Sequence, residues 1–404
     1  MPDQRPPQIG WDMAEPDAAL PSFLATLPST PQLLGLGEPT HGVMDFPVWR
    51  NRILQSLVHT QGFCSIAIES DVIAGMRANA HVISGQDTLD NVMQRGFSHG
   101  FGQLQANREL LSWMRAFNAG REDLERVRFY GFDPPLENLW AASPRHCLLA
   151  LHAFLARHFA HLPADRASIE QLCGEDARWT DQAAAMDPSQ SVGATEDARQ
   201  LRALADDLLA FLETQLPGLT PQPDLWEARL HARTAQGLLR YHANLAAPSP
   251  ERISQMLALR AVMMTENLMA IAAHEAPRGP TLVFAHNSHL QRGASRIRMD
   301  TMNADWWPAG AHLSESLGQQ YAFIATSSGE GAGLPAPQPD TLEGWLSGQS
   351  GAPTLYATQK LASLLPATLV KRTDTAGNRA YFPLASERIS QIDGLLFLPT
   401  LTEK

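Results

Sequence analysis

Short apolar runs alternate with amphipathic segments over the first third of this sequence. The runs at 33–37, 64–69 and 127–133 are typical of buried strands, and the segments 44–60, 72–83 and 105–117 carry apolar residues at helical spacing. Strand, helix and strand in repeated succession predict a parallel sheet with right-handed crossovers. We therefore expect an α/β fold with a mostly parallel central sheet flanked by helices.

The middle of the chain changes character. From 144 to 275 the strand-like runs disappear, and helical stretches follow one another, separated by breaks rich in Pro and Gly. Strand signals return at 281–285, 320–326 and 394–398, whereas 327–339 has the composition of a surface loop. We expect an N-terminal extension (1–30), a first part of the α/β core with the catalytic motifs (31–143), a helical insertion covering the cleft (144–275) and a second part of the core (276–404).

Polar and titratable side chains stand where four of these strands end. They are Glu38 and His41 in the segment 38–42, Glu69 and Asp71 after the second strand, Asp133 after the third, and His286, Asn287 and His289 after the strand at 281–285. Ligands of parallel sheets bind beyond the carboxyl ends of the strands, so these residues predict one site at one edge of the sheet. A carboxylate and an imidazole three residues apart, as in Glu38 and His41, are the parts of a general base.

Composition restricts the partners and the compartment. The 404 residues carry a formal net charge of −11, which argues against nucleic acid or an anionic membrane as the main partner. The cysteines, Cys64, Cys147 and Cys173, are odd in number and lack metal-ligand spacing, so a disulfide framework is not expected. The first residues lack the features of a signal peptide, and no run reaches the roughly 18 uninterrupted apolar residues of a membrane helix. We expect a cytoplasmic protein, and the sequence leaves its oligomeric state open.

Several motifs occur in an order that resembles the erythromycin esterase family. They are Gly37-Glu38-Pro39-Thr40-His41-Gly42, Ile68-Glu69, Asn107-Arg108-Glu109 with Trp113-Met114-Arg115-Ala116-Phe117-Asn118, Gly131-Phe132-Asp133 and Ala285-His286-Asn287-Ser288-His289. The best-studied members of that family hydrolyse the lactone of macrolide antibiotics. The resemblance runs from about Leu33 to the C-terminus and implies a mixed α/β core with a helical insertion and a deep cleft.

The resemblance also implies roles for single residues. It implies that His41 is the base and that Glu38 and Glu69 are the carboxylates beside it. Arg50 and His286 match further catalytic positions. The residues expected to bind the substrate are His289, Asp133, Asp71, Asn287 and Arg260. The implied reaction is hydrolysis of a small-molecule ester or lactone without a cofactor: a neutral imidazole takes a proton from water, and Arg50 stabilises the oxyanion. Whether Glu38 or Glu69 orients His41 stays open at this point.

Two departures from the family pattern concern the substrate. Relatives often carry a Thr-Trp pair near the second helix, where this chain has the segment 97–102, and an Arg-Asp pair where it has Arg260-Ala261. We therefore expect the catalytic residues to be retained and the substrate contacts to differ, so that the substrate need not be a macrolide. We expect His99, within that segment, to be a helix-surface or loop residue, together with His81, His152, His158 and His161.

Other interpretations use the same residues. The Glu and His side chains of the predicted site could hold a divalent metal ion in a metal-dependent hydrolase. A tailoring enzyme of natural-product biosynthesis, such as a transacylase or cyclase, would activate a hydroxyl or amine of its substrate instead of water. A ligand-binding protein would use the cleft without turnover. Glu69 could also serve as a buried ion-pair partner of Arg50.

Overall fold

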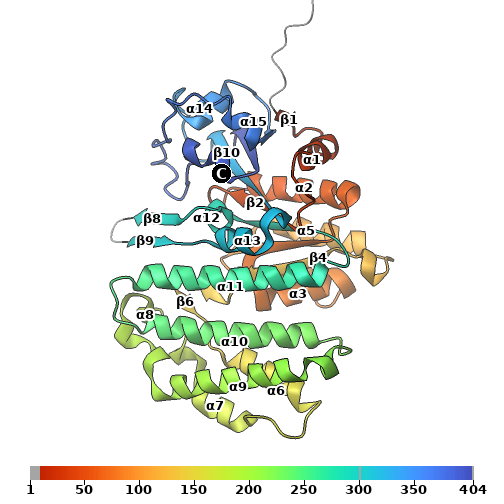
Figure 1. Cartoon of the computed structure of the whole chain (residues 1–404), viewed down its shortest axis with the longest axis vertical. Coiled ribbons are helices and arrows are strands. Elements are labelled where there is room, and N and C mark those ends of the chain that lie inside the picture. Colours follow the sequence, from red (N-terminus) through yellow and green to blue (C-terminus); the bar gives the residue numbers. More distant parts are fainter. Residues whose placement is uncertain (1–9, 300–301, 403–404) are drawn as a thin grey trace, which may run out of the picture.

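The computed structural model describes residues 10–299 and 302–402, and these contain an eight-stranded sheet (Figure 1). The strand order is β1-β11-β12-β10-β2-β7-β3-β4. The bounds are β1 (Gly10–Asp12), β2 (Leu33–Glu38), β3 (Ser65–Asp71), β4 (Arg128–Asp133), β7 (Thr281–His286), β10 (Tyr321–Glu330), β11 (Thr354–Ala357) and β12 (Gly394–Thr400). Neighbouring strands from β12 to β4 run parallel, and only the β1–β11 and β11–β12 pairs of this sheet are antiparallel. The predicted α/β fold with a mostly parallel sheet is confirmed.

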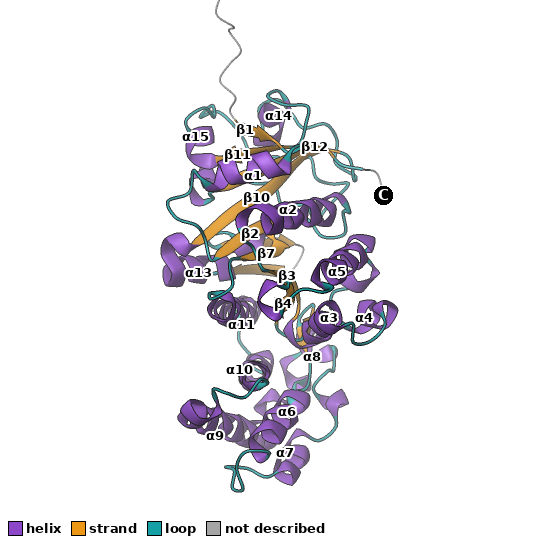
Figure 2. Cartoon of the chain, turned by 90° about the vertical axis from the view of Figure 1, so that its right-hand side faces the viewer, coloured by secondary structure: helices purple, strands orange, loops and turns teal. Residues whose placement is uncertain are grey.

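Helices cover both faces of the sheet (Figure 2). The longer ones are α1 (Pro16–Leu24), α2 (Asp45–Gln61), α3 (Val72–Ser84), α5 (Gln105–Asn118), α6 (Arg145–Ala156), α7 (Arg166–Cys173), α9 (Glu196–Leu219), α10 (Leu225–Leu245), α11 (Arg252–Glu275) and α13 (Ala309–Leu317). Successive side chains of β2 point to opposite faces, so Leu34 and Leu36 pack in the core beneath α2 and α5, and Leu33 packs in the core beneath α11 and α13.

Strand β7 lies between β2 and β3, although β2 and β3 are consecutive strands of the core in sequence. Its last residue, His286, pairs in register with Glu38 of β2, and on the other side of β3 Asp71 pairs with Asp133 of β4. The carboxyl ends of β2, β7, β3 and β4 therefore meet at one edge, as the polar strand ends predicted.

The helical part follows the first four core strands. No strand interrupts residues 145–275, all of which the structure describes, and α6, α7, α9 and α10 stack on the side of α11 that faces away from the sheet (Figure 1). Helix α11 packs on β4, α10 and α13, and it is the one described helix whose length and apolar composition would suit a membrane. Its contacts on both sides account for that composition. The division of the chain into separate units at these boundaries stays a prediction.

Parts of the chain differ from the expected pattern. Residues of the expected extension join the core, because β1 pairs with β11 and α1 packs on α2. The expected loop at 327–339 begins later, since 327–330 continue β10 beside β12. Two hairpins had no clear sequence signal: β5 (Leu136–Glu137) with β6 (Trp140–Ala141), and β8 (Ser295–Met299) with β9 (Met302–Trp306). The short helices are α4 (Leu89–Arg95), α8 (Ala183–Met186), α12 (Asn287–Leu290), α14 (Leu342–Ser347) and α15 (Thr358–Ala362).

Gly75 allows α3 to approach β4 closely, and this contact can be tested. A Cβ at Gly75 would lie 2.5 Å from the backbone nitrogen of Gly131, whereas a Cβ at Gly218, inside α9, would meet nothing within 4 Å. Gly75→Ala is expected to lower the free energy of unfolding by about 1–3 kcal/mol through overpacking. Gly218→Ala is expected to raise it by up to about 1 kcal/mol, because Ala is the better helix former. Denaturant unfolding of both variants measures this; equal effects of the two substitutions would contradict the packing argument.

Candidate functional site

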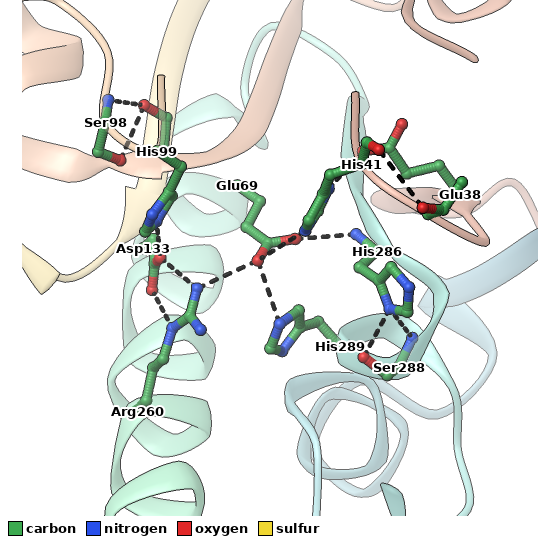
Figure 3. A network of polar contacts seen from close by, with 12 residues as sticks. Glu38, His41, Glu69, Ser98, His99, Asp133, Arg260, His286, Ser288 and His289 are labelled. Atoms are coloured by element: carbon green, nitrogen blue, oxygen red, sulfur yellow. Dashed lines mark hydrogen bonds and ion pairs between the residues drawn. The ribbon is translucent and has the colours of Figure 1, made fainter. Parts of the chain in front are cut away.

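Glu38 is the last residue of β2, and His41 lies in the turn that follows it. His41 Nδ1 lies 2.7 Å from Glu38 Oε1, and the turn is fastened by the backbone N–H of Phe382, which donates to the carbonyl oxygen of Pro39. Because the Glu38 carboxylate accepts, Nδ1 carries a proton and Nε2 is the ring nitrogen left for chemistry. Nε2 faces Glu69 at 3.8 Å, so Glu38, not Glu69, orients the ring (Figure 3). The His41 side chain is 41% exposed, which allows water and a substrate to reach it.

Glu69, at the end of β3, is a buried carboxylate that several elements contact (Figure 3). Its Oε1 lies 3.1 Å from Arg260 Nη2 and 3.1 Å from His289 Nε2, and its Oε2 accepts from the backbone N–H of His286. Burial alone would raise the pKa of Glu69, but His289, His41 and Arg260 outweigh it and hold that pKa well below its usual range. Glu69 is therefore an anion throughout the neutral range.

Arg260 reaches the site from α11. Its Nε donates to Asp133 Oδ1 at 2.9 Å, and its Nη2 donates to Asp133 Oδ2 at 2.5 Å as well as to Glu69 Oε1. Burial disfavours both charges, yet their pairing raises the pKa of Arg260 and lowers the pKa of Asp133. The cation beside Glu69 is thus Arg260, and the alternative that paired Glu69 with Arg50 is wrong.

His99 belongs to the site, which the sequence interpretation missed. Its Nε2 lies 2.8 Å from Asp133 Oδ2 and its Nδ1 lies 3.1 Å from Glu137 Oε2, while its backbone N–H donates to Glu137 Oε1 at 2.7 Å. The side chain is only 17% exposed. His99 lies in a loop, as expected, but its ring points inward to Asp133 (Figure 3). The one sequence signal that pointed to His99 was the departure of the segment 97–102 from the family pattern.

Arg50 does not take the position expected of an oxyanion contact. It is 1% exposed, donates twice to Asn51 Oδ1, and lies with its guanidinium 5.0 Å from the ring centre of Phe284. Burial, opposed in part by Glu38, lowers the pKa of Arg50 to about 9. Arg50 therefore lies in the core, where its charge acts on Glu38, and its expected contact with the oxyanion stays a prediction.

His286 lies beside His41, with ring centres 5.3 Å apart, but both of its ring nitrogens have protein partners. Nε2 donates to the carbonyl oxygen of Pro39 at 3.0 Å, and Nδ1 accepts from the backbone N–H of Ser288 at 3.1 Å. Burial, with a contribution from His41, lowers the pKa of His286 to about 3, so the ring stays neutral. These contacts hold His286 between two strand ends, and its expected catalytic role stays a prediction.

Asp71 and Asn287, expected to bind the substrate, make contacts within the fold. The carboxylate of Asp71 accepts from the backbone N–H groups of Ile73 and Ala74 and caps α3. The Asn287 amide donates to the carbonyl oxygen of Thr326 at 2.8 Å. Burial raises the pKa of Asp71 to about 6. A role for either residue in substrate binding stays a prediction.

The charges around His41 determine its protonation. Burial favours the neutral ring, but the negative charges of Glu69 and Glu38 outweigh this and raise the pKa of His41 to about 9. Burial raises the pKa of Glu38 as well. Since Glu69 adds a second negative charge on the far side of the ring, we assign the proton shared by the pair to His41. Roughly one ring in a hundred is then neutral at pH 7.

Within residues 10–299 and 302–402, no three side chains of His, Cys, Asp or Glu are arranged to hold a metal ion. Glu69 and His289, which the metal-dependent interpretation would use, contact each other instead, with His289 Nε2 3.1 Å from Glu69 Oε1. The described residues thus show no ready ligand set, and the choice between a metal-free and a metal-dependent reaction stays a prediction.

Comparisons with known proteins agree with the fold and the motifs. The family model described as erythromycin esterase matches residues 58–401, a range that begins after the Glu38–His41 turn. An erythromycin esterase type II of Escherichia coli is 24% identical over 329 residues, covering 78% of this chain and 73% of that protein. Among solved structures, a succinoglycan biosynthesis protein aligns with a TM-score of 0.71 at 18% identity, covering 98% of this chain and 94% of that one. A mutant of erythromycin esterase EreC in its open conformation aligns with a TM-score of 0.67 at 18% identity, covering 94% and 93%.

Arg260→Leu is expected to destabilise the protein by about 3–5 kcal/mol, because it leaves Asp133 and Glu69 buried without their cation. Adding Asp133→Asn to this variant should restore part of the stability, since it removes one of the two uncompensated charges. As a matched control, Arg199→Leu breaks an exposed pair with Glu196 (side chains 59% and 69% exposed) and should cost less than about 1 kcal/mol. Thermal and denaturant unfolding compare the variants; similar losses for Arg260→Leu and Arg199→Leu would contradict the argument.

Proposed function

This chain belongs to the erythromycin esterase family, and from that membership and the geometry of His41 we propose that it hydrolyses an ester or lactone with water activated by His41. The observation that carries the proposal is the Glu38–His41 pair at 2.7 Å, with Nε2 of an accessible imidazole directed toward the buried Glu69. The proposed reaction uses no metal ion and no other cofactor.

The proposed reaction begins with the neutral ring. His41 Nε2 takes a proton from a water molecule, and the water oxygen forms a bond to the carbonyl carbon of the substrate. The tetrahedral intermediate collapses, the bond to the alcohol oxygen breaks, and the imidazolium returns the proton to that oxygen. Glu38 holds the ring in the Nδ1–H tautomer and stabilises the imidazolium, the task that a carboxylate partner performs for a catalytic histidine.

Arg260 is better placed than Arg50 to stabilise the oxyanion. Its side chain is 14% exposed, and it shares Glu69 Oε1 with His41. Its Nη1 has no hydrogen-bond partner among the described residues, whereas Nε and Nη2 are engaged. We therefore propose that Nη1 donates to the oxyanion, where a donor fixed in advance has its largest effect.

The substrate is a small molecule with an ester or lactone bond. The E. coli relative is named an erythromycin esterase, so macrolides are the first candidates, although the segment 97–102 differs from the family pattern. A panel of esters and lactones, including macrolides of several ring sizes, tests this by mass spectrometry, since hydrolysis adds the mass of water to the product. The cysteines Cys64, Cys147 and Cys173 are buried and unpaired, in keeping with a reducing compartment, and the cytoplasmic location stays a prediction.

His41→Ala is expected to lower kcat by at least about 100-fold on any substrate that the panel identifies, the usual contribution of a general base. The control is His161→Ala, because His161 is exposed in the helical part of the chain. Steady-state rates of chelator-treated enzyme provide the comparison. Turnover by His41→Ala within a few-fold of the unsubstituted enzyme would refute the role of His41, and a complete loss of activity on chelation would refute the metal-free reaction.

The rate should depend on pH in the direction set by the raised pKa of His41. Only the neutral ring accepts a proton, so kcat/KM should rise tenfold per pH unit and level off near pH 9. Glu38→Gln keeps an acceptor for Nδ1–H but removes a negative charge, which lowers the pKa of His41. The rise should then occur at a pH lower by about one unit. A profile of Glu38→Gln that coincides with the original, or moves to higher pH, would contradict this assignment.

A further inference from the structure

His99 and Glu137 make an unusual arrangement beside the base. Both ring nitrogens of His99 meet carboxylates, Asp133 at 2.8 Å and Glu137 at 3.1 Å, and Glu137 also accepts from the backbone N–H of His99. Burial lowers the pKa of His99, but Asp133 outweighs it and raises that pKa above its ordinary value, which favours the protonated ring. In that form both N–H groups are engaged, and no donor is left for a substrate. The pair therefore acts on the site through other residues.

Those residues form a continuous series of contacts. Asp133 is fully buried and accepts from His99 on Oδ2, the same oxygen that accepts from Arg260 Nη2. Nη2 also donates to Glu69 Oε1, the oxygen that faces His41 Nε2. Asp133 and Glu69 thus share the guanidinium of Arg260. The more of the Asp133 charge His99 satisfies, the more of Nη2 remains for Glu69.

We propose that His99, held by Glu137, is a positioning residue that divides Arg260 between Asp133 and Glu69 and so limits how strongly Glu69 holds the proton of His41. This inference depends on the proposed function only for its effect on rate. The charged groups around His99 are Glu137 of the β5–β6 hairpin, Asp133 of β4, Arg260 of α11, and Glu69 and Asp71 at the end of β3.

The direction of the effect follows from the charges. Without the His99 N–H, Asp133 draws Arg260 away from Glu69, and a less neutralised Glu69 attracts the proton on His41 more strongly. The neutral fraction of His41 at a given pH falls, and the reaction slows at pH 7. The loss should disappear at a pH high enough to deprotonate the ring in both proteins.

Two substitutions of His99 separate its contact with Asp133 from its contact with Glu137 and from the charge of its ring. In His99→Gln the amide nitrogen takes the place of Nε2 and can still donate to Asp133, whereas in His99→Asn it takes the place of Nδ1 and reaches only Glu137. Residue 99 has a left-handed backbone (φ of 57°), which Asn tolerates best, so a loss in the Asn variant is not due to backbone strain. Both variants remove the charge of the ring equally.

The first measurement needs no substrate: the His41 imidazole is titrated by NMR in the full chain, with its signals assigned by their absence in His41→Ala. His99→Asn should move the His41 titration upward by about one pH unit, and His99→Gln by clearly less; a one-unit shift reduces the neutral fraction about tenfold. Glu137→Ala should move it in the same direction as His99→Asn. Identical titrations in the original protein and His99→Asn would overturn the proposal.

The second measurement uses turnover. kcat of His99→Asn should be about tenfold lower at pH 7 with KM unchanged, and the deficit should close above pH 10. A deficit of the same size at every pH, or equal deficits in the Asn and Gln variants, would indicate a purely structural role and overturn the proposal. Absence of ester hydrolysis by the unsubstituted enzyme would overturn the proposed function instead, because the titrations stand without it.

Discussion

The site depends on one buried carboxylate, that of Glu69. A carboxylate taken out of water is costly unless cations and N–H groups compensate it, and here the compensation comes from separate parts of the chain: Arg260 of α11, His289 of α12 and the backbone of His286. The carboxylate of Glu69, whose charge acts on His41, thus also joins α11 to the edge of the sheet. The position of α11 and the electrostatics of the site therefore depend on the same contacts.

The two carboxylates beside His41 have opposing effects on its use as a base. Glu38 selects the tautomer of His41, and Glu69 places a negative charge near its reactive nitrogen, but the two charges together also keep the ring protonated. A base is most effective when its pKa lies near the operating pH. Arg260, beside Glu69, acts in the opposite direction, because its positive charge lowers the pKa of His41.

The sequence predicted the fold class and the common edge at which four strands end. Both predictions depend on local patterns of apolar residues, which a short segment of the chain already shows. Glu38, His41, Glu69, Asp133 and His286 were found in this way. The pairing of Glu38 with His41 was found as well. The cation that pairs with Glu69 was not, since the choice of Arg260 instead of Arg50 depends on where α11 crosses the sheet. His99 was missed because its meaning depends on Glu137, which stands in a two-residue strand too short to show a pattern.

The insertion of β7 between β2 and β3 bears on how the molecule assembles. A ribosome-bound chain that has emerged only as far as α11 holds both flanking strands but not the one that separates them, so its sheet cannot close in the native order. The two strands must stay apart, or separate again, until residues 281–286 arrive. Pairings of such long sequence separation are slow to form. Assembly of the catalytic edge is accordingly a late event of biosynthesis, and fragments that end before this strand lack the means to form it.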